Sequence, residues 1–195
     1  LMNLALAEQR AGEYVAAEAS FLRVIELIEG SGRLTSPRLA RAHAGLASTY
    51  HAARRYDLAA AEFETAIALN RRSEGLFNEA QLPLLERQVD SLTELGRFDE
   101  AQRARRYALQ VVGRRHGESS VPYARELESL GRWYTRVGSY EASRSTLRKS
   151  VELFAALSGP SSTDLVGPLT ALGENARRWL QDPQFLAAAA AGPER

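Results

Sequence analysis

An aromatic residue recurs along this chain at a constant interval of 42 positions. The series consists of Tyr14, Tyr56, Phe98 and Tyr140. Each aromatic follows a short turn signal and opens a stretch in which apolar residues have helical spacing. A fixed period of this size indicates a stacked array, because a single helical hairpin cannot bury both of its apolar faces. The period therefore predicts an all-α fold, an α-solenoid of antiparallel helix pairs.

The fourth unit shows the pattern within one period. Leu127, Leu130 and Tyr134 lie on one helix face before the turn at Gly138, and Leu147 continues the apolar pattern after it. Repeating this pattern divides the chain into four helix pairs and a fifth first helix. The expected ranges are about 1–30, 36–73, 78–115, 120–157 and, for the last helix, 162–180.

The loops between the units keep the same period. Three of them contain a glycine, and these are Gly75, Gly117 and Gly159. A residue that commonly caps helices follows in every loop, in the series Ser36, Asn78, Ser120 and Ser162. We expect each glycine to end a helix with a positive φ, and each capping side chain to accept a hydrogen bond from the next helix.

The helix at 162–180 is expected to cap the array, because no complete second helix follows it. Leu169, Leu172 and Ala176 would face the fourth unit. The outer side would be kept soluble by Glu174, Arg177 and Arg178.

Residues 181–195 form either a short helix or a flexible tail. Asp182-Pro183 is a helix start signal, whereas the alanine-rich stretch behind it favours fraying equally. If the helix forms, Phe185 and Leu186 would cover the remaining apolar strip of the cap. Trp179 is the tryptophan that we expect to be more exposed, since the next repeat is missing there.

Composition limits the classes of function. The chain has 195 residues, 45% of them hydrophobic, which is enough for a sizeable core. A net charge of +1 gives no global reason to expect nucleic acid, and no apolar run reaches the length that a membrane span needs. Because cysteine is absent, disulfides and thiol chemistry are excluded.

Two features concern the origin of the chain. Only one of its 25 lysine and arginine residues is a lysine, which favours a GC-rich, bacterial genome. The sequence begins inside a helical pattern without an initiator methionine, so we expect a piece of a longer protein. The sequence favours the cytoplasm without deciding the compartment, because the expected upstream part of the protein would carry any targeting segment.

Leu130-Gly131, Tyr134, Gly138 and Tyr140 together resemble the tetratricopeptide repeat. The period of 42 is similar to that of the long-helix subclass found in kinesin light chains. The resemblance covers about residues 1–180 and implies a right-handed superhelix. It also places small residues where helices cross closely, in the series Ala47, Val89, Gly131 and Gly173.

The resemblance implies a peptide-binding groove along the first helices of the repeats. Gly45 falls at one of the groove positions. The charged and histidine side chains at these positions are Arg41, His51, Glu86, Arg87, Asp90, Glu94, Arg125, Glu128, Arg132, Arg136, Glu174, Arg177 and Arg178. They give the third unit an acidic sector and the fourth unit and last helix a basic one.

Two interpretations of these charges stay open. A groove with arginine forks suits a partner peptide with carboxylates or phosphates. The alternative is an ordinary solvated surface, in which Glu86, Asp90 and Glu94 pair with Arg87, Arg125 or Arg132 of neighbouring helices.

The sequence contains no constellation of residues that predicts catalysis. His43, His51 and His116 lie on different units or faces, so we expect neither a metal site nor a cofactor. The leading hypothesis is a non-catalytic scaffold for a protein or peptide, without a nucleic-acid partner or membrane insertion, and self-association stays open. The alternative is a regulatory arm of a longer bacterial signalling protein, a kinase or ATPase.

Overall fold

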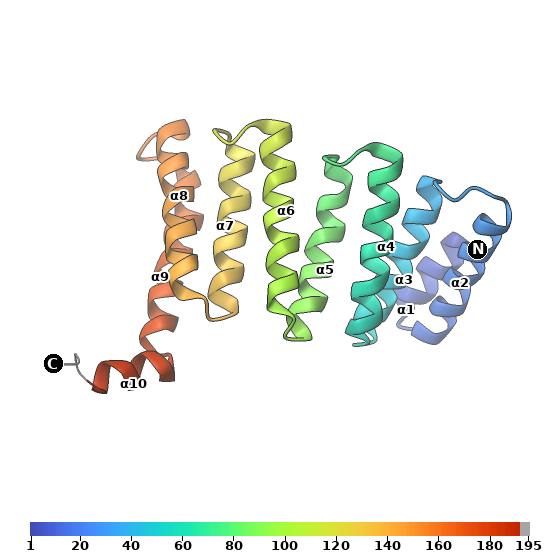
Figure 1. Cartoon of the computed structure of the whole chain (residues 1–195), viewed down its shortest axis with the longest axis horizontal. Coiled ribbons are helices and arrows are strands. Elements are labelled where there is room, and N and C mark those ends of the chain that lie inside the picture. Colours follow the sequence, from blue (N-terminus) through green and yellow to red (C-terminus); the bar gives the residue numbers. More distant parts are fainter. Residues whose placement is uncertain (192–195) are drawn as a thin grey trace. The chain divides into compact units, whose positions relative to one another are not determined.

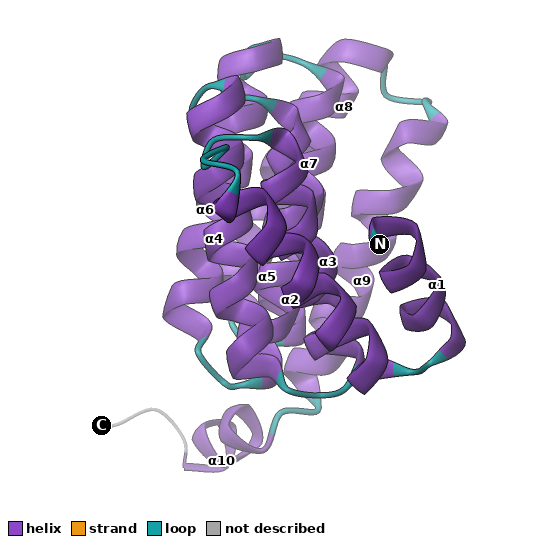
Figure 2. Cartoon of the chain, turned by 90° about the vertical axis from the view of Figure 1, so that its right-hand side faces the viewer, coloured by secondary structure: helices purple, strands orange, loops and turns teal. Residues whose placement is uncertain are grey.

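The computed structural model describes residues 1–191, with side chains described up to residue 187. These residues form helices and loops without any strand, which confirms the all-α prediction (Figure 2). The chain divides into two compact units, here called the N-terminal unit (Leu1–Val111) and the C-terminal unit (Val112–Arg195). The boundary lies inside helix α6 (Phe98–His116), and each unit is described by itself.

The N-terminal unit consists of successive antiparallel helices (Figure 1). They are α1 (Met2–Ala11), α2 (Tyr14–Gly30), α3 (Pro37–Ala52), α4 (Tyr56–Glu74), the 3-10 turn η1 (Glu79–Gln81), α5 (Leu82–Glu94) and most of α6. Helix α2 packs against both α1 and α3, and α4 packs against both α3 and α5. Phe21, Leu46 and Phe63 are fully buried in the core of this unit. Ile67, Leu85 and Ala108 join α4, α5 and α6.

The C-terminal unit repeats the hairpin once and ends with a helix on its open side. Its elements are the end of α6, α7 (Val121–Arg136), α8 (Tyr140–Ser158), the 3-10 turn η2 (Thr163–Leu165), α9 (Val166–Leu180) and α10 (Pro183–Ala191). Helix α9 contacts both α7 and α8. Leu147 and Phe154 of α8 are fully buried in this core.

The loop glycines have the backbone conformation that their period predicts. Gly75, Gly117 and Gly159 have φ angles of 95°, 85° and 88°. The capping side chains of the loops are confirmed in three of four cases, since the hydroxyls of Ser36, Ser120 and Ser162 each accept a backbone N–H. The prediction for Asn78 is wrong, because its side-chain amide donates to the carbonyl of Gly75 and its side chain accepts no backbone N–H.

Arg54 occupies the turn position that glycine holds in the other repeats. Its φ angle is 59°, in the left-handed region that costs an L-residue about 1–2 kcal/mol. Glycine removes this strain but loses about 0.5–1 kcal/mol through its freer unfolded chain. Arg54→Gly should therefore raise the free energy of unfolding by up to about 1 kcal/mol in denaturant titrations. Ala53→Gly, at an ordinary φ of −79°, is the control and should lower it.

The close helix crossing predicted at Gly131 is confirmed. A Cβ atom there would lie 2.5 Å from Cγ of Leu147. The same prediction is wrong for Gly173, where a Cβ would meet no atom within 4 Å, because no second helix of a fifth repeat packs on it. Gly45 was expected at the groove surface, yet a Cβ there would lie 2.3 Å from the ring of Phe21.

The register predicted for the capping helix is wrong. Leu169 is 51% exposed and Ala176 is also exposed. The buried positions of the cap are Leu165, Pro168, Ala171 and Asn175. The apolar spacing predicted that Leu169 and Leu172 face the core, whereas the buried face of α9 consists of Pro168, Ala171 and Asn175.

Residues 183–191 form the short helix α10, and the carboxylate of Asp182 accepts the backbone N–H of Gln184 at 2.8 Å. Trp179 is half-buried between Tyr140, which stacks on it at 6.2 Å, and Phe185, which meets it edge-on at 5.9 Å. Leu186 is exposed, so the expectation that it covers the cap is wrong. The part of the tail expectation that concerns residues 192–195 lies outside the described residues.

Candidate functional site

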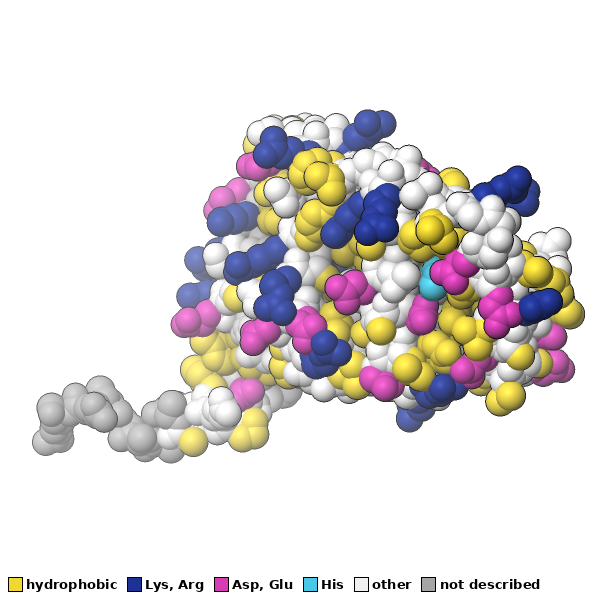
Figure 3. Space-filling model, turned by 45° about the vertical axis from the view of Figure 1, so that its right-hand side comes forward, with side chains coloured by type: hydrophobic (Ala, Val, Ile, Leu, Met, Phe, Trp, Pro, Cys, Tyr) yellow, Lys and Arg dark blue, Asp and Glu magenta, His cyan; other side chains and the backbone are white. Residues whose placement is uncertain are grey.

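The predicted groove residues fall into two sets, one in each unit. Six lie on α3 and α5 of the N-terminal unit: Arg41, His51, Glu86, Arg87, Asp90 and Glu94. Seven lie on α7 and α9 of the C-terminal unit: Arg125, Glu128, Arg132, Arg136, Glu174, Arg177 and Arg178. Cationic and anionic side chains alternate on the face drawn in Figure 3.

The acidic sector of the N-terminal unit surrounds a histidine. Nδ1 of His51 lies 2.9 Å from the hydroxyl of Ser91, and the His51 ring meets that of Tyr56 edge-on. Burial lowers the pKa of His51 from its usual value, and the nearby Arg87 lowers it further. The carboxylates of Asp90 and Glu94 oppose this effect without reversing it.

The lowered pKa of His51 predicts a pH dependence of stability. A folded pKa below the unfolded value of 6.5 means that the unfolded chain binds the proton more tightly. Stability is therefore full above pH 6.5 and is lost as the pH falls through the folded pKa. The melting temperature of His51→Gln should therefore fall less between pH 7.5 and pH 5.5 than that of the wild type. Thermal melting at constant ionic strength measures both changes. An equal fall in both proteins would contradict the assignment.

Four residues of the second set line one hollow between α7 and α9. This hollow, here called the arginine pocket, has a volume of about 200 Å³. Its lining consists of Arg132, Thr135, Arg136, Ala171, Glu174 and Arg178. Three arginines and one glutamate from two helices thus line a space large enough for a small anionic group.

Two of the arginines that line the pocket already hold partners within the C-terminal unit. Arg132 pairs with Glu128 at 2.9 Å and donates to the carbonyl of Gly167. Arg178 pairs with Glu174 at 2.8 Å. Both of these ion pairs lie within single helices. All four side chains are partly exposed, so solvent keeps each pair weak and a competing anion can enter.

Arg125 and Arg177 do not line the arginine pocket. Arg125 lies 3.6 Å from the carboxylate of Asp164 in η2. Arg177 is exposed beside the pocket on α9.

A buried polar network, which the sequence analysis missed, fixes the two walls of the arginine pocket. The hydroxyl of Thr135 lies 2.7 Å from that of Ser143 and donates to Oδ1 of Asn175 at 3.2 Å. The Asn175 amide donates to the carbonyl of Tyr140. Since all three side chains are buried, breaking one bond would leave a polar atom unsatisfied at a cost of about 1–3 kcal/mol. The network therefore holds α9 at one angle to α7.

No group of three or more histidine or acidic residues is placed to hold a metal ion among the residues that the structure describes. Nor does any described helix combine the length and apolarity that crossing a membrane requires.

A family model described as tetratricopeptide repeat matches residues 1–72. Residues 1–72 thus carry the tetratricopeptide repeat. The resemblance found in the sequence is thus confirmed, and the helix pairs of both units have the repeat's organisation. No curated protein sequence matches the chain significantly.

Solved structures extend the likeness in fold beyond residue 72. One is a protein from Podosopora anserina assigned as a kinesin light chain with nearly identical TPR-like repeats. Its sequence is 15% identical to this one, and the two structures match with a TM-score of 0.74 over 95% of this chain and 88% of that chain. A substituted form of that protein matches with a TM-score of 0.73 over 97% of this chain and 90% of that chain, again at 15% sequence identity. BtubC (BKLC) from P. vanneervenii is 18% identical, with a TM-score of 0.62 over 98% and 82%. At these identities the likeness shows the fold alone.

Proposed function

We propose that this chain is a non-catalytic scaffold that binds a protein or peptide, and that the arginine pocket holds a carboxylate of that partner. The repeat fold is consistent with a protein-interaction scaffold. The observation that carries the proposal is the convergence of Arg132, Arg136 and Arg178 on one hollow. A planar guanidinium binds a carboxylate through two parallel hydrogen bonds, and three of them around one hollow favour an acidic ligand.

The rigidity of the pocket supports this proposal. Thr135 and Asn175 fix the two helices that carry the arginines, so binding does not require the walls to be ordered first. Arg132 and Arg178 already pair with Glu128 and Glu174, so an incoming carboxylate competes with these two partly exposed glutamates for the guanidinium groups. An acidic side chain or a chain terminus of the partner fits a volume of about 200 Å³, whereas a whole peptide would extend beyond it. The wider groove along the first helices stays a prediction.

The experiment is a pull-down with the intact chain and two matched double variants. Arg132→Glu/Arg136→Glu reverses two charges in the pocket. Arg148→Glu/Lys149→Glu makes the same change of charge on exposed positions of α8. We expect the pocket variant to lose the bound partner and the α8 variant to retain it, with both variants melting as single folded species. If every captured partner binds the pocket variant as well as the wild type, the arginine pocket is not the binding site.

A further inference from the structure

A separate hollow lies in the N-terminal unit, where the chain turns from α3 into α4. It has a volume of about 400 Å³ and lies between the first turns of α2 and the turn that follows α3. Its main lining residues are Tyr14, Val15, Glu18, Tyr50, Arg54 and Arg55. We call this hollow the turn pocket. None of the charged or histidine residues predicted for the groove lines it.

The turn pocket lies at the junction of two successive repeats. Helices α2 and α3 belong to the first and the second repeat and pack against each other. Val15 is 84% exposed, and Asp57, its counterpart one period later, is exposed as well, although α4 packs against both α3 and α5. The exposure of this position is therefore a property of the repeat itself.

Glu18 fixes the inner wall of the turn pocket. One of its carboxylate oxygens accepts the Tyr50 hydroxyl at 2.9 Å, and the other accepts an N–H of Nη1 of Arg55 at 2.6 Å. Burial and the neighbouring Glu18 raise the pKa of Tyr50 to about 12, so the phenol keeps its proton and donates. The Arg55 guanidinium also lies 4.6 Å from the centroid of the Tyr50 ring. Arg55 is thus held in place by two contacts while part of its guanidinium stays exposed.

This arrangement is not repeated at the next junction of the N-terminal unit. Ala60 and Leu92 stand one period after Glu18 and Tyr50. Arg97, the counterpart of Arg55, pairs instead with Glu100 in the first turn of α6. The packing of repeats therefore does not require the two residues that orient Arg55.

Arg54 adds a second cation to the turn pocket at a cost to the backbone. The equivalent turn residues are Gly12, Gly96 and Gly138, so of these four positions this one alone carries a side chain at a positive φ. The Arg54 guanidinium and the Tyr14 hydroxyl hold no side-chain partner among the residues that the structure describes. Strained residues are concentrated at functional sites, and here the strain places a free cation beside Arg55.

We infer that the turn pocket binds an acidic peptide segment of a partner protein. One carboxylate of the segment lies between Arg54 and Arg55, because adjacent guanidinium groups favour a carboxylate. An apolar side chain next to it packs against Val15. A ligand that is only apolar would cover Arg54 without compensating its charge, and a small anion alone would leave most of the 400 Å³ unfilled. The turn pocket shares no residue with the arginine pocket, so the two sites can be tested separately.

Nuclear magnetic resonance of the intact, isotope-labelled chain tests the turn pocket locally. The probe is the peptide Gly-Ser-Leu-Glu-Leu-Gly-Ser with both ends blocked, and the control peptide has glutamine in place of glutamate. We expect the amide signals of Val15, Ala53 and Arg55 to shift along one saturation curve with the probe. The control peptide should bind about tenfold more weakly, since it lacks the charge. Absence of a saturable shift of these signals up to about 1 mM probe, or equal binding of the two peptides, would overturn the inference.

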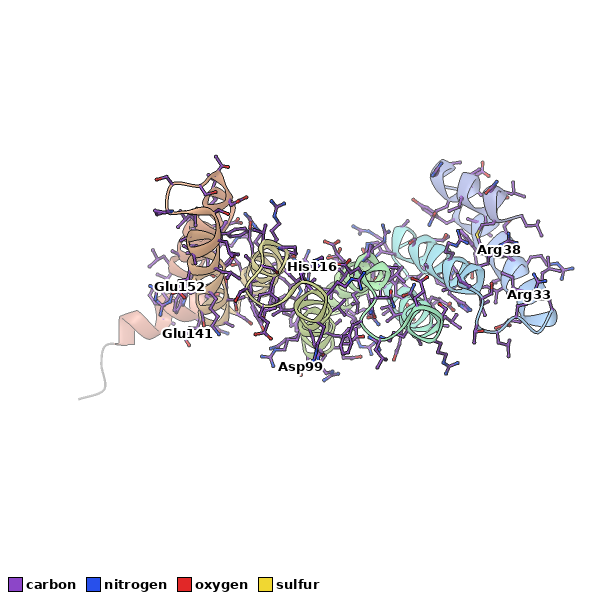
Figure 4. The ribbon with its side chains drawn as sticks, turned by 90° about the horizontal axis from the view of Figure 1, so that it is seen from above. Arg33, Arg38, Asp99, His116, Glu141 and Glu152 are labelled. Atoms are coloured by element: carbon purple, nitrogen blue, oxygen red, sulfur yellow. The ribbon has the colours of Figure 1, made fainter. Side chains whose placement is uncertain are left out.

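Arg54→Gly separates binding from stability. It should weaken the probe about tenfold and leave the melting temperature equal or higher, because glycine relieves the positive φ of 59°. Arg33→Gly is the matched control, at an exposed position of the loop between α2 and α3 (Figure 4) and at the opposite end of α3. This control should bind the probe as the wild type does. If Arg54→Gly also binds it with the wild-type affinity, the inference is wrong.

Two further titrations distinguish the turn pocket from other anion sites. Inorganic phosphate at constant ionic strength should not produce saturable shifts of the same signals. If it binds there as tightly as the probe, the pocket takes phosphate and the inference is wrong. The Arg132→Glu/Arg136→Glu variant should show the wild-type shifts of Val15, Ala53 and Arg55, so failure of the arginine pocket leaves this result unchanged. Loss of the shifts in that variant would contradict a separate site.

Discussion

A chain that ends before Leu165 should lose on the order of 3–6 kcal/mol of stability in its C-terminal unit and should self-associate. The deletion removes the buried Leu165, Pro168 and Ala171, and it uncovers Phe154, which packs in one cluster with Leu165. It also leaves the buried hydroxyl of Thr135 without Asn175. Because a domain is stabilised by only about 5–15 kcal/mol, a loss of this size makes the unit marginal. Thermal melting and light scattering measure both effects.

Deletion of residues 182–195 is the matched control. It removes the edge-on contact of Phe185 with Trp179, whereas Leu186 is already exposed. The expected loss in the free energy of unfolding is about 1 kcal/mol, because the deletion removes only one partly buried large side chain. If the chain without residues 165–195 melts like the full chain and stays monomeric, α9 is not a cap.

Replacement of Phe21 by alanine should destabilise the N-terminal unit by about 3–5 kcal/mol, the usual cost of emptying a fully buried phenylalanine site. The Phe21 side chain is inaccessible to solvent and lies in the cluster that joins α1, α2, α3 and α4. Its ring packs directly against Gly45 of α3, so replacing it by a methyl group leaves a cavity between α2 and α3. Urea titration of the free energy of unfolding measures the loss.

The contact between Phe21 and Gly45 can also be tested by a substitution at Gly45. Gly45→Ala places a methyl group about 2.3 Å from the Phe21 ring and should cost about 1–3 kcal/mol, although alanine favours the helix. In the background of Phe21→Leu the same substitution should cost less, because the smaller side chain leaves room. Additive effects of the two substitutions would contradict direct contact between the residues.

The repeated hairpins were predictable because their signals are local. A positive φ at Gly117 and the cap at Ser120 depend on residues a few positions apart, and the period adds independent copies of each signal. The register of α9 was not predictable in this way. Both of its faces carry leucines, and Asn175 is buried only because Thr135 and Tyr140 provide partners from other helices.

The features of the candidate site also divide into those with a local sequence signal and those that depend on contacts between helices. Arg132, Arg136 and Arg178 were found from their place in the repeat, since a helix face follows from spacing. The network of Thr135, Ser143 and Asn175 was missed because its three polar residues come from three different helices. No local spacing in the sequence connects them.

Photo-crosslinking in the native host tests the arginine pocket most directly. A photo-reactive amino acid at position 177 lies on α9 beside Glu174 and Arg178, and one at position 148 lies on an exposed part of α8. We predict that position 177 captures a partner through an acidic segment identified by mass spectrometry, that position 148 does not, and that Arg132→Glu/Arg136→Glu abolishes the capture. Equal capture at both positions, or capture that survives the double substitution, would contradict the account.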